Sequence, residues 1–185
     1  MVQIPSSHPL SQLFRHLVGR RFCRDAGVRD AEACSYVSEV LIRFTHIENL
    51  YRIRNARGRR LEDVAEMLLE SNPLLDGRSF DREREVRRHI GDYTLFFAGI
   101  FPERLEHLPR LKRLSLDVFV DYIRAGKESY GIVSAFNLFE YRREASLFRR
   151  LADGFEQCVY GLNLVKRDLE TLQRTHYCLW QEALD

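Results

Sequence analysis

Five residues in two segments have the chemistry to bind a small ligand: His89, Asp92, Tyr93, Glu128 and Tyr130. Asp92 directly precedes the longest uncharged apolar run in the chain, which begins at Tyr93. Its carboxylate must be solvated, hydrogen-bonded or paired with arginine, because burying it alone would be costly. Carboxylates and tyrosine hydroxyls in an aromatic wall would suit a ligand pocket. A structural ion pair or a helix cap is the alternative interpretation of Asp92, and it is the more common one.

A cluster of arginines forms a second candidate site, for an anion or a nucleic acid. It consists of five arginines directly after Tyr51, namely Arg52, Arg54, Arg57, Arg59 and Arg60. The planar guanidinium group binds phosphate and carboxylate groups through paired hydrogen bonds. Acidic residues follow closely and could pair with these arginines within the protein, namely Glu62, Asp63, Glu66 and Glu70. The 29 basic and 27 acidic residues leave a net charge of +2, which excludes a strongly cationic surface over the whole molecule.

Standard catalytic and metal-binding motifs are absent from the sequence. There is no Glu-x-x-His pair for a di-metal site, no nucleophile elbow, no phosphate loop and no glycine-rich dinucleotide motif. The four cysteines form no Cys-x-x-Cys pair, so we expect reduced thiols and predict no metal site. No cofactor is indicated. Glu39 and His46 share a helix face with Arg43 and Asn49, and we expect that face to be solvated.

The apolar periodicity that must position these residues is helical along most of the chain. A first helix is expected at about 8–24, and Asp30 can cap a second whose apolar seam continues to Tyr51. Residues 51–61 form a hairpin or a loop with a turn at 55–58, and a short helix is expected at about 60–71. The next helix, at 81–101, is charged in its first half and apolar all round in its second half, which is typical of a central helix.

The second half of the chain continues this helical pattern. Pro109 can open a helix that Gly126 ends, and a short helical segment follows at 127–139. The clearest pattern lies at 143–174, where apolar residues keep heptad spacing from Phe148 to Leu172. These observations predict an all-α fold: residues 1–185 form a single-domain bundle of about six or seven helices, with 143–174 as its longest helix and 81–101 in its centre.

The sequence favours a non-catalytic helical protein that acts by binding, either through self-association as a homodimer or by docking a protein partner. The alternative is a bundle with an internal small-molecule or cofactor pocket, with or without enzymatic activity. Nucleic-acid binding through the arginine cluster is the third and least favoured function. The N-terminal residues lack a signal-peptide pattern, so we expect a cytoplasmic protein. No membrane span is expected, because the longest uncharged apolar run is far shorter than the ~20 residues that a spanning helix needs.

Overall fold

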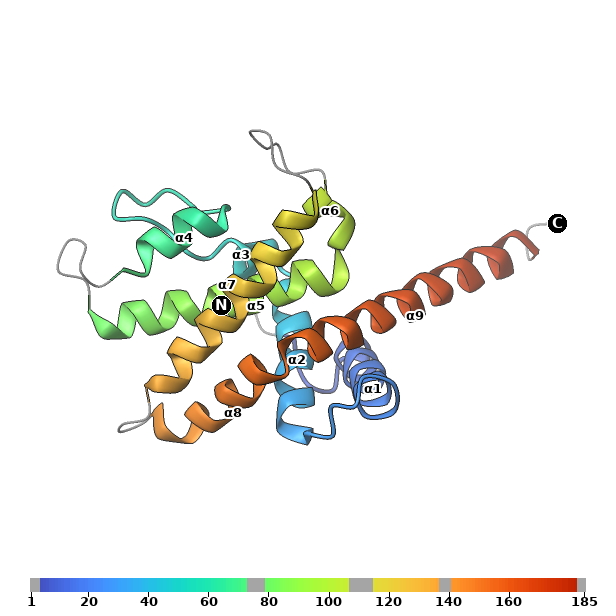
Figure 1. The fold of residues 1–185 in the computed structure, drawn as a ribbon. Coiled ribbons are helices and arrows are strands. Elements are labelled where there is room, and N and C mark those ends of the chain that lie inside the picture. Colours follow the sequence, from blue (N-terminus) through green and yellow to red (C-terminus); the bar gives the residue numbers. More distant parts are fainter. Residues whose placement is uncertain (1–3, 73–78, 107–114, 137–140, 183–185) are drawn as a thin grey trace.

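The computed structural model describes residues 4–72, 79–106, 115–136 and 141–182, without the side chains of residues 106, 115–118 and 175–182. These residues form an all-α fold, as the sequence predicts (Figure 1). Within the described ranges no strand is present, and an isolated antiparallel bridge joins Arg54 to Arg60. The helices are α1 (Pro9–Arg24), α2 (Ala31–Phe44), α3 (Ile47–Leu50), α4 (Val64–Glu70), α5 (Phe80–Ile100), α6 (Pro102–Glu106), α7 (Ser115–Ala135), α8 (Arg142–Asp153) and α9 (Phe155–Glu182).

Helix α5 lies at the centre of the fold, in agreement with the helix predicted at 81–101. Ser79 caps it by accepting a hydrogen bond from the backbone N–H of Arg82 at 3.2 Å. Its second half is almost entirely buried, and it packs most extensively against α7 and then against α9. The residues at the junction of its charged and apolar halves are therefore enclosed by other helices.

Helix α2 begins as predicted and ends earlier than predicted. Asp30 caps it by accepting hydrogen bonds from the backbone N–H groups of Glu32 and Ala33. The helix stops at Phe44, and the short helix α3 precedes Tyr51. The expected turn at 55–58 is present, closed by a 2.9 Å hydrogen bond from the Gly58 N–H to the Asn55 carbonyl.

Helix α7 is one continuous helix where the sequence predicted a helix ending at Gly126 and a separate segment at 127–139. Gly126 lies inside α7, where a Cβ atom would overlap the side chains of Phe155 and Thr94. The glycine therefore permits a close approach between helices and does not end one. Residues 109–114 and 137–139 of the two predicted segments lie outside the described residues.

The single long helix predicted at 143–174 is wrong in one respect, because it is interrupted at Gly154. Helix α8 ends at Asp153 and α9 starts at Phe155, with Gly154 at φ −100° and ψ 22°. Glycine is a poor helix former. A single glycine between the apolar positions leaves their heptad spacing unchanged, so the spacing did not predict this interruption. The Gly154 N–H still donates to the Arg150 carbonyl at 2.9 Å, and α9 continues in nearly the direction of α8 (Figure 1).

The seam of this helix pair is buried from Phe148 to Val165, as its spacing predicted. Farther along, Leu172 is 41% exposed, because the last turns of α9 project beyond the other helices (Figure 1). Among the described helices, none combines the length and the apolar character that crossing a membrane requires.

Candidate functional site

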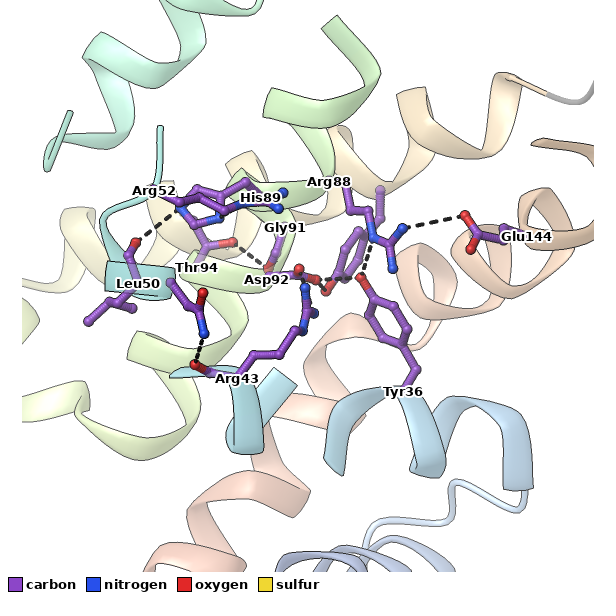
Figure 2. Close-up of polar contacts among 12 residues, drawn as sticks. Tyr36, Arg43, Leu50, Arg52, Arg88, His89, Gly91, Asp92, Thr94 and Glu144 are labelled. Carbon is purple, nitrogen blue, oxygen red and sulfur yellow. Dashed lines mark hydrogen bonds and ion pairs between the residues drawn. The ribbon is translucent and has the colours of Figure 1, made fainter. Parts of the chain in front are cut away.

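The carboxylate of Asp92 is buried and makes three hydrogen bonds within the protein. Its Oδ1 accepts from the hydroxyl of Tyr36 at 2.6 Å and from that of Tyr130 at 2.9 Å, and its Oδ2 accepts from Nη2 of Arg43 at 2.9 Å (Figure 2). Asp92 is 1% exposed. Both oxygens therefore have partners, two from α2 and one from α7, and such pairing is the condition for a stable buried charge.

The protonation states in this network are fixed by its own charges. Burial opposes ionisation of Asp92, but the charges of Arg43 and Arg88 and the hydrogen bonds from the two tyrosines outweigh it, so its pKa lies below the usual range. Burial and the Asp92 charge raise the pKa of Tyr36 and of Tyr130. The carboxylate therefore stays ionised and both hydroxyls stay protonated.

Gly91 makes room for the tyrosine from α7. A Cβ atom at Gly91 would overlap the ring of Tyr130, which packs directly on the α5 backbone at this point. Tyr130 is fully buried, and its ring also contacts that of Phe148 at a centroid distance of 5.5 Å. The Tyr130 hydroxyl reaches Asp92 because α5 carries no side chain at the preceding position.

His89 lies one helical turn before Asp92 and anchors an arginine. Its Nδ1 accepts a hydrogen bond from Nε of Arg52 at 3.2 Å, so the ring proton is on Nε2, which donates to the Leu50 carbonyl at 3.1 Å (Figure 2). Burial, followed by the charge of Arg52, lowers the pKa of His89 to about 3. The residue is therefore a neutral histidine near neutral pH.

The four residues expected to share a pocket do not converge on one cavity. Asp92 and Tyr130 are in contact, whereas the Tyr93 hydroxyl donates to the backbone carbonyl of Glu62 at 3.0 Å. The Glu128 side chain is 60% exposed and lies 3.6 Å from the Arg87 guanidinium. The prediction that these residues share one pocket is therefore wrong. Successive residues of a helix point about 100° apart, so the Tyr93 side chain is turned away from that of Asp92.

A polar cleft of about 380 Å³ opens next to this network. We call it the arginine-lined cleft; its lining residues are Glu39, Arg43, Arg52, Asp81, Arg84, Glu85, Arg88 and Tyr141. They come from α2, from the segment after Tyr51, from the first half of α5 and from the start of α8. The buried network around Asp92 therefore lies next to the open, charged cleft, and Arg43 belongs to both.

Three of the four arginines in the cleft have a carboxylate partner. Arg43 pairs with Asp92, and Glu144 accepts from Arg84 at 2.6 Å and from Arg88 at 3.5 Å. Arg84 also stacks on the ring of Tyr141, with its guanidinium carbon 4.0 Å from the ring centroid. These three guanidinium groups are held in place by partners inside the protein.

Arg52 is the exception among the cleft arginines. No carboxylate of the described residues lies within 4.0 Å of it, and its side-chain hydrogen bond is to the neutral His89. The side chain is partly buried, and burial lowers the pKa of Arg52. Because a guanidinium stays charged in proteins, Arg52 presents a positive charge that Asp92 and Glu85 influence only from a distance, without a direct ion pair among the described residues.

The remaining arginines of the sequence cluster do not act together with Arg52. Arg59 pairs with Glu66 at 2.6 Å, as the following acidic residues suggested. Nη1 of Arg54 donates to the Gly58 carbonyl at 2.9 Å and braces the turn. Arg57 and Arg60 are exposed. The cluster thus divides into one arginine that faces the cleft and four that belong to the surface turn.

Sequence reasoning missed Tyr36 and Arg88 and misplaced Arg43. The predicted solvated face is wrong for Arg43 on α2, which reaches the buried Asp92. It is also wrong for Asn49 on α3, which is 8% exposed and donates to the Arg43 carbonyl. The sequence did contain one indication of Arg88: a buried Asp92 needs a cation nearby, and Arg88 lies four residues earlier on the same helix.

Within the described part of the chain, no group of three or more His, Cys, Asp or Glu residues could hold a metal ion. No family model matches the chain, and no curated protein or solved structure is significantly similar to it.

Proposed function

We propose that this chain is a non-catalytic binding protein that docks a protein partner, and that the arginine-lined cleft receives a carboxylate of that partner. The observation that carries this proposal is Arg52, a partly buried guanidinium that lines the cleft and forms no ion pair with a carboxylate of the described residues. A charged group removed from water is stabilised by an opposite charge, and arginine binds carboxylates in a charge-assisted, often bidentate manner.

The charge of the cleft favours a carboxylate over a phosphate. Its lining residues are four arginines and three acids, a formal charge of four minus three, or +1, and three of the arginines are already paired with Asp92 or Glu144 behind the lining. A phosphate monoester carries about −1.5 to −2 and would be repelled by Glu39, Asp81 and Glu85. A partner's Asp or Glu side chain adds a single negative charge, and the amide groups around it can donate to those acids.

The buried network supports binding over catalysis. General acid–base catalysis requires a titrating group within reach of a substrate proton. Asp92 is held ionised by partners on both oxygens, and both ring nitrogens of His89 have partners inside the protein. These groups fix the positions of Arg43 and Arg52, which line the cleft.

A titration with blocked amino acids tests the proposal. The probes are N-acetyl-glutamate amide and the neutral N-acetyl-glutamine amide, and the readout is the NMR signal of each arginine Nε–H. We expect the glutamate probe to shift the Arg52 signal in a saturable way. Because hydrogen bonds to charged groups contribute about 1.5–3 kcal/mol, Arg52→Gln should weaken binding by about tenfold or more.

Arg57→Gln is the matched control, because Arg57 lies in the same segment and is exposed on the surface turn. It should bind the glutamate probe as the unaltered protein does. Equal responses to the glutamate and glutamine probes would overturn the proposal, as would equal losses in the two variants. Tighter binding of inorganic phosphate would replace it with a phosphate site, and strongly salt-dependent binding of an oligonucleotide would replace it with nucleic-acid recognition.

Self-association, the other form of binding expected from the sequence, remains a prediction, as does a cytoplasmic location. The internal-pocket alternative also remains a prediction, but without the pairing expected for it, because Asp92 is buried and the Glu128 side chain is exposed.

A further inference from the structure

A second pocket, of about 410 Å³, lies against a different face of α5. We call it the tyrosine pocket; its lining residues are Tyr51, Glu62, Asp63, Tyr93, Phe97, Arg104, Leu105 and Tyr122. Tyr93 and Phe97 come from α5, Tyr122 from α7, and Arg104 and Leu105 from α6. Four aromatic rings and two carboxylates therefore meet at one hollow.

The aromatic rings form a tilted wall. The ring centroid of Tyr93 lies 6.3 Å from that of Tyr51 at an interplanar angle of 58°, and 4.6 Å from that of Phe97 at 46°. Tyr93 is 4% exposed and Phe97 is 6% exposed, so the core fixes both rings. The face of an aromatic ring carries partial negative charge, and a cation within about 6 Å of its centroid is attracted to it.

The charges around the pocket add to this attraction. Glu62 and Asp63 are both exposed at its edge. The cation of the lining, Arg104, lies over the ring of Phe101 with its guanidinium carbon 5.4 Å from the centroid. Two acids against one base leave the lining at −1, which disfavours an anionic ligand.

The Tyr93 hydroxyl completes the polar part of the pocket. Burial, the neighbouring hydroxyls of Tyr122 and Tyr51 and the carboxylates of Glu62 and Asp63 raise the pKa of Tyr93. The hydroxyl therefore stays protonated and donates to the Glu62 carbonyl at 3.0 Å. Because the hydroxyl proton of Tyr93 is already donated to the Glu62 carbonyl, the Tyr93 oxygen can accept a hydrogen bond from a ligand but cannot donate one.

We propose that the tyrosine pocket binds an organic ammonium cation, such as a quaternary ammonium or a methylated amine. Such a cation carries apolar methyl groups that contact the rings, and a diffuse positive charge that the ring faces and the edge carboxylates stabilise. The site is separate from the arginine-lined cleft, and it does not depend on the function proposed for that cleft.

Choline and its neutral isostere 3,3-dimethylbutan-1-ol provide a direct test, because they differ chiefly in the charge on the central atom. Binding to the full chain is measured by NMR titration. We expect saturable binding of choline at least about fivefold tighter than that of the isostere, the increment typical of a cation over aromatic rings. Glu62→Gln should weaken choline binding and leave binding of the isostere unchanged.

Tyr51→Leu should also weaken choline binding, and Tyr160→Leu is its matched control, because Tyr160 is 53% exposed on α9. If Tyr51→Leu fails to fold, Glu62→Gln still tests the proposal, because it alters an exposed side chain and its choline binding can be measured in the folded protein. Equal affinity for choline and the isostere would overturn the proposal, and so would a lack of saturable choline binding. Arg52→Gln should bind choline normally, which separates failure of this site from failure of the cleft.

Discussion

His89 and Asp92 are polar residues in the middle of a protein core, and each is kept there by partners distant in sequence. Asp92 depends on Tyr36, Arg43 and Tyr130, and His89 depends on Arg52 and on the Leu50 carbonyl. The partners of each residue require one protonation state: Asp92 must be ionised and His89 must be neutral. Acid conditions therefore act against both.

Protonation of His89 makes the free energy of unfolding depend on pH. Its pKa is about 3 in the folded protein and 6.5 in the unfolded chain, so the unfolded chain binds more protons between these values. The stabilisation is complete above pH 6.5 and decreases as the pH falls toward 3, by about 1.4 kcal/mol per pH unit. Between pH 7.5 and pH 5, His89 should account for a loss of about 2 kcal/mol.

Urea denaturation of His89→Gln at the two pH values measures this contribution. The variant should lose about 2 kcal/mol less than the unaltered protein on acidification, whatever its stability at pH 7.5. His16→Gln is the control for replacing a histidine, since the His16 side chain is exposed on α1. An unchanged pH dependence in His89→Gln would show that the histidine protonates freely in the folded protein.

At the scale of helices, the predicted starts of α1 and α5 and the predicted ends of α1, α4 and α5 agree with the structure to within one residue. Asp30 caps α2 as expected because a cap is a local interaction between a side chain and the next backbone N–H groups. The roles of Gly126 and Gly154 were exchanged: the glycine expected to end a helix lies inside α7, and the one expected inside a helix separates α8 from α9. Which glycine ends a helix depends on what packs against it, and a sequence window does not contain that neighbour.

Two glycines close together allow a matched test of the contact between α5 and α7. Gly91→Ala would force the Tyr130 ring away from α5, and we expect a loss of about 1–3 kcal/mol, as for other overpacked cores. Gly131→Ala places its methyl group on α7 with nothing within 4 Å, so helix propensity should raise stability by up to about 1 kcal/mol. Thermal and urea unfolding measure both changes, and a neutral Gly91→Ala would show that the contact is not tight.

At the scale of the whole molecule, the compact set of helices around α5 contrasts with the projecting part of α9 (Figure 1). Val165 is fully buried, whereas residues 170–174 are all exposed. A helix without tertiary contacts is marginally stable in water. The projecting turns therefore depend on the helix that continues from the core, unless another molecule covers them.

Hydrogen exchange of α9 tests this contrast. In dilute protein, amides of residues 170–174 should exchange at least about a hundredfold faster than those of 158–165, which lie in the packed half of the helix. Protection of 170–174 that increases with protein concentration would support the predicted self-association. Equal protection of both halves in dilute protein would contradict the expectation that the exposed turns of α9 are less stable than its packed half.

The sequence by itself determined the all-α class, the central position of the helix at 81–101, the Asp30 cap and most of the apolar seam at 143–174. Each depends on a periodicity or a cap that is read within a few helical turns. The tertiary structure decided that Arg43 faces inward, that Arg52 separates from its cluster, and that Tyr93 turns to a different pocket from Asp92. The partners of Asp92 lie 56, 49 and 38 residues away in the chain, and only packing brings such distant groups together.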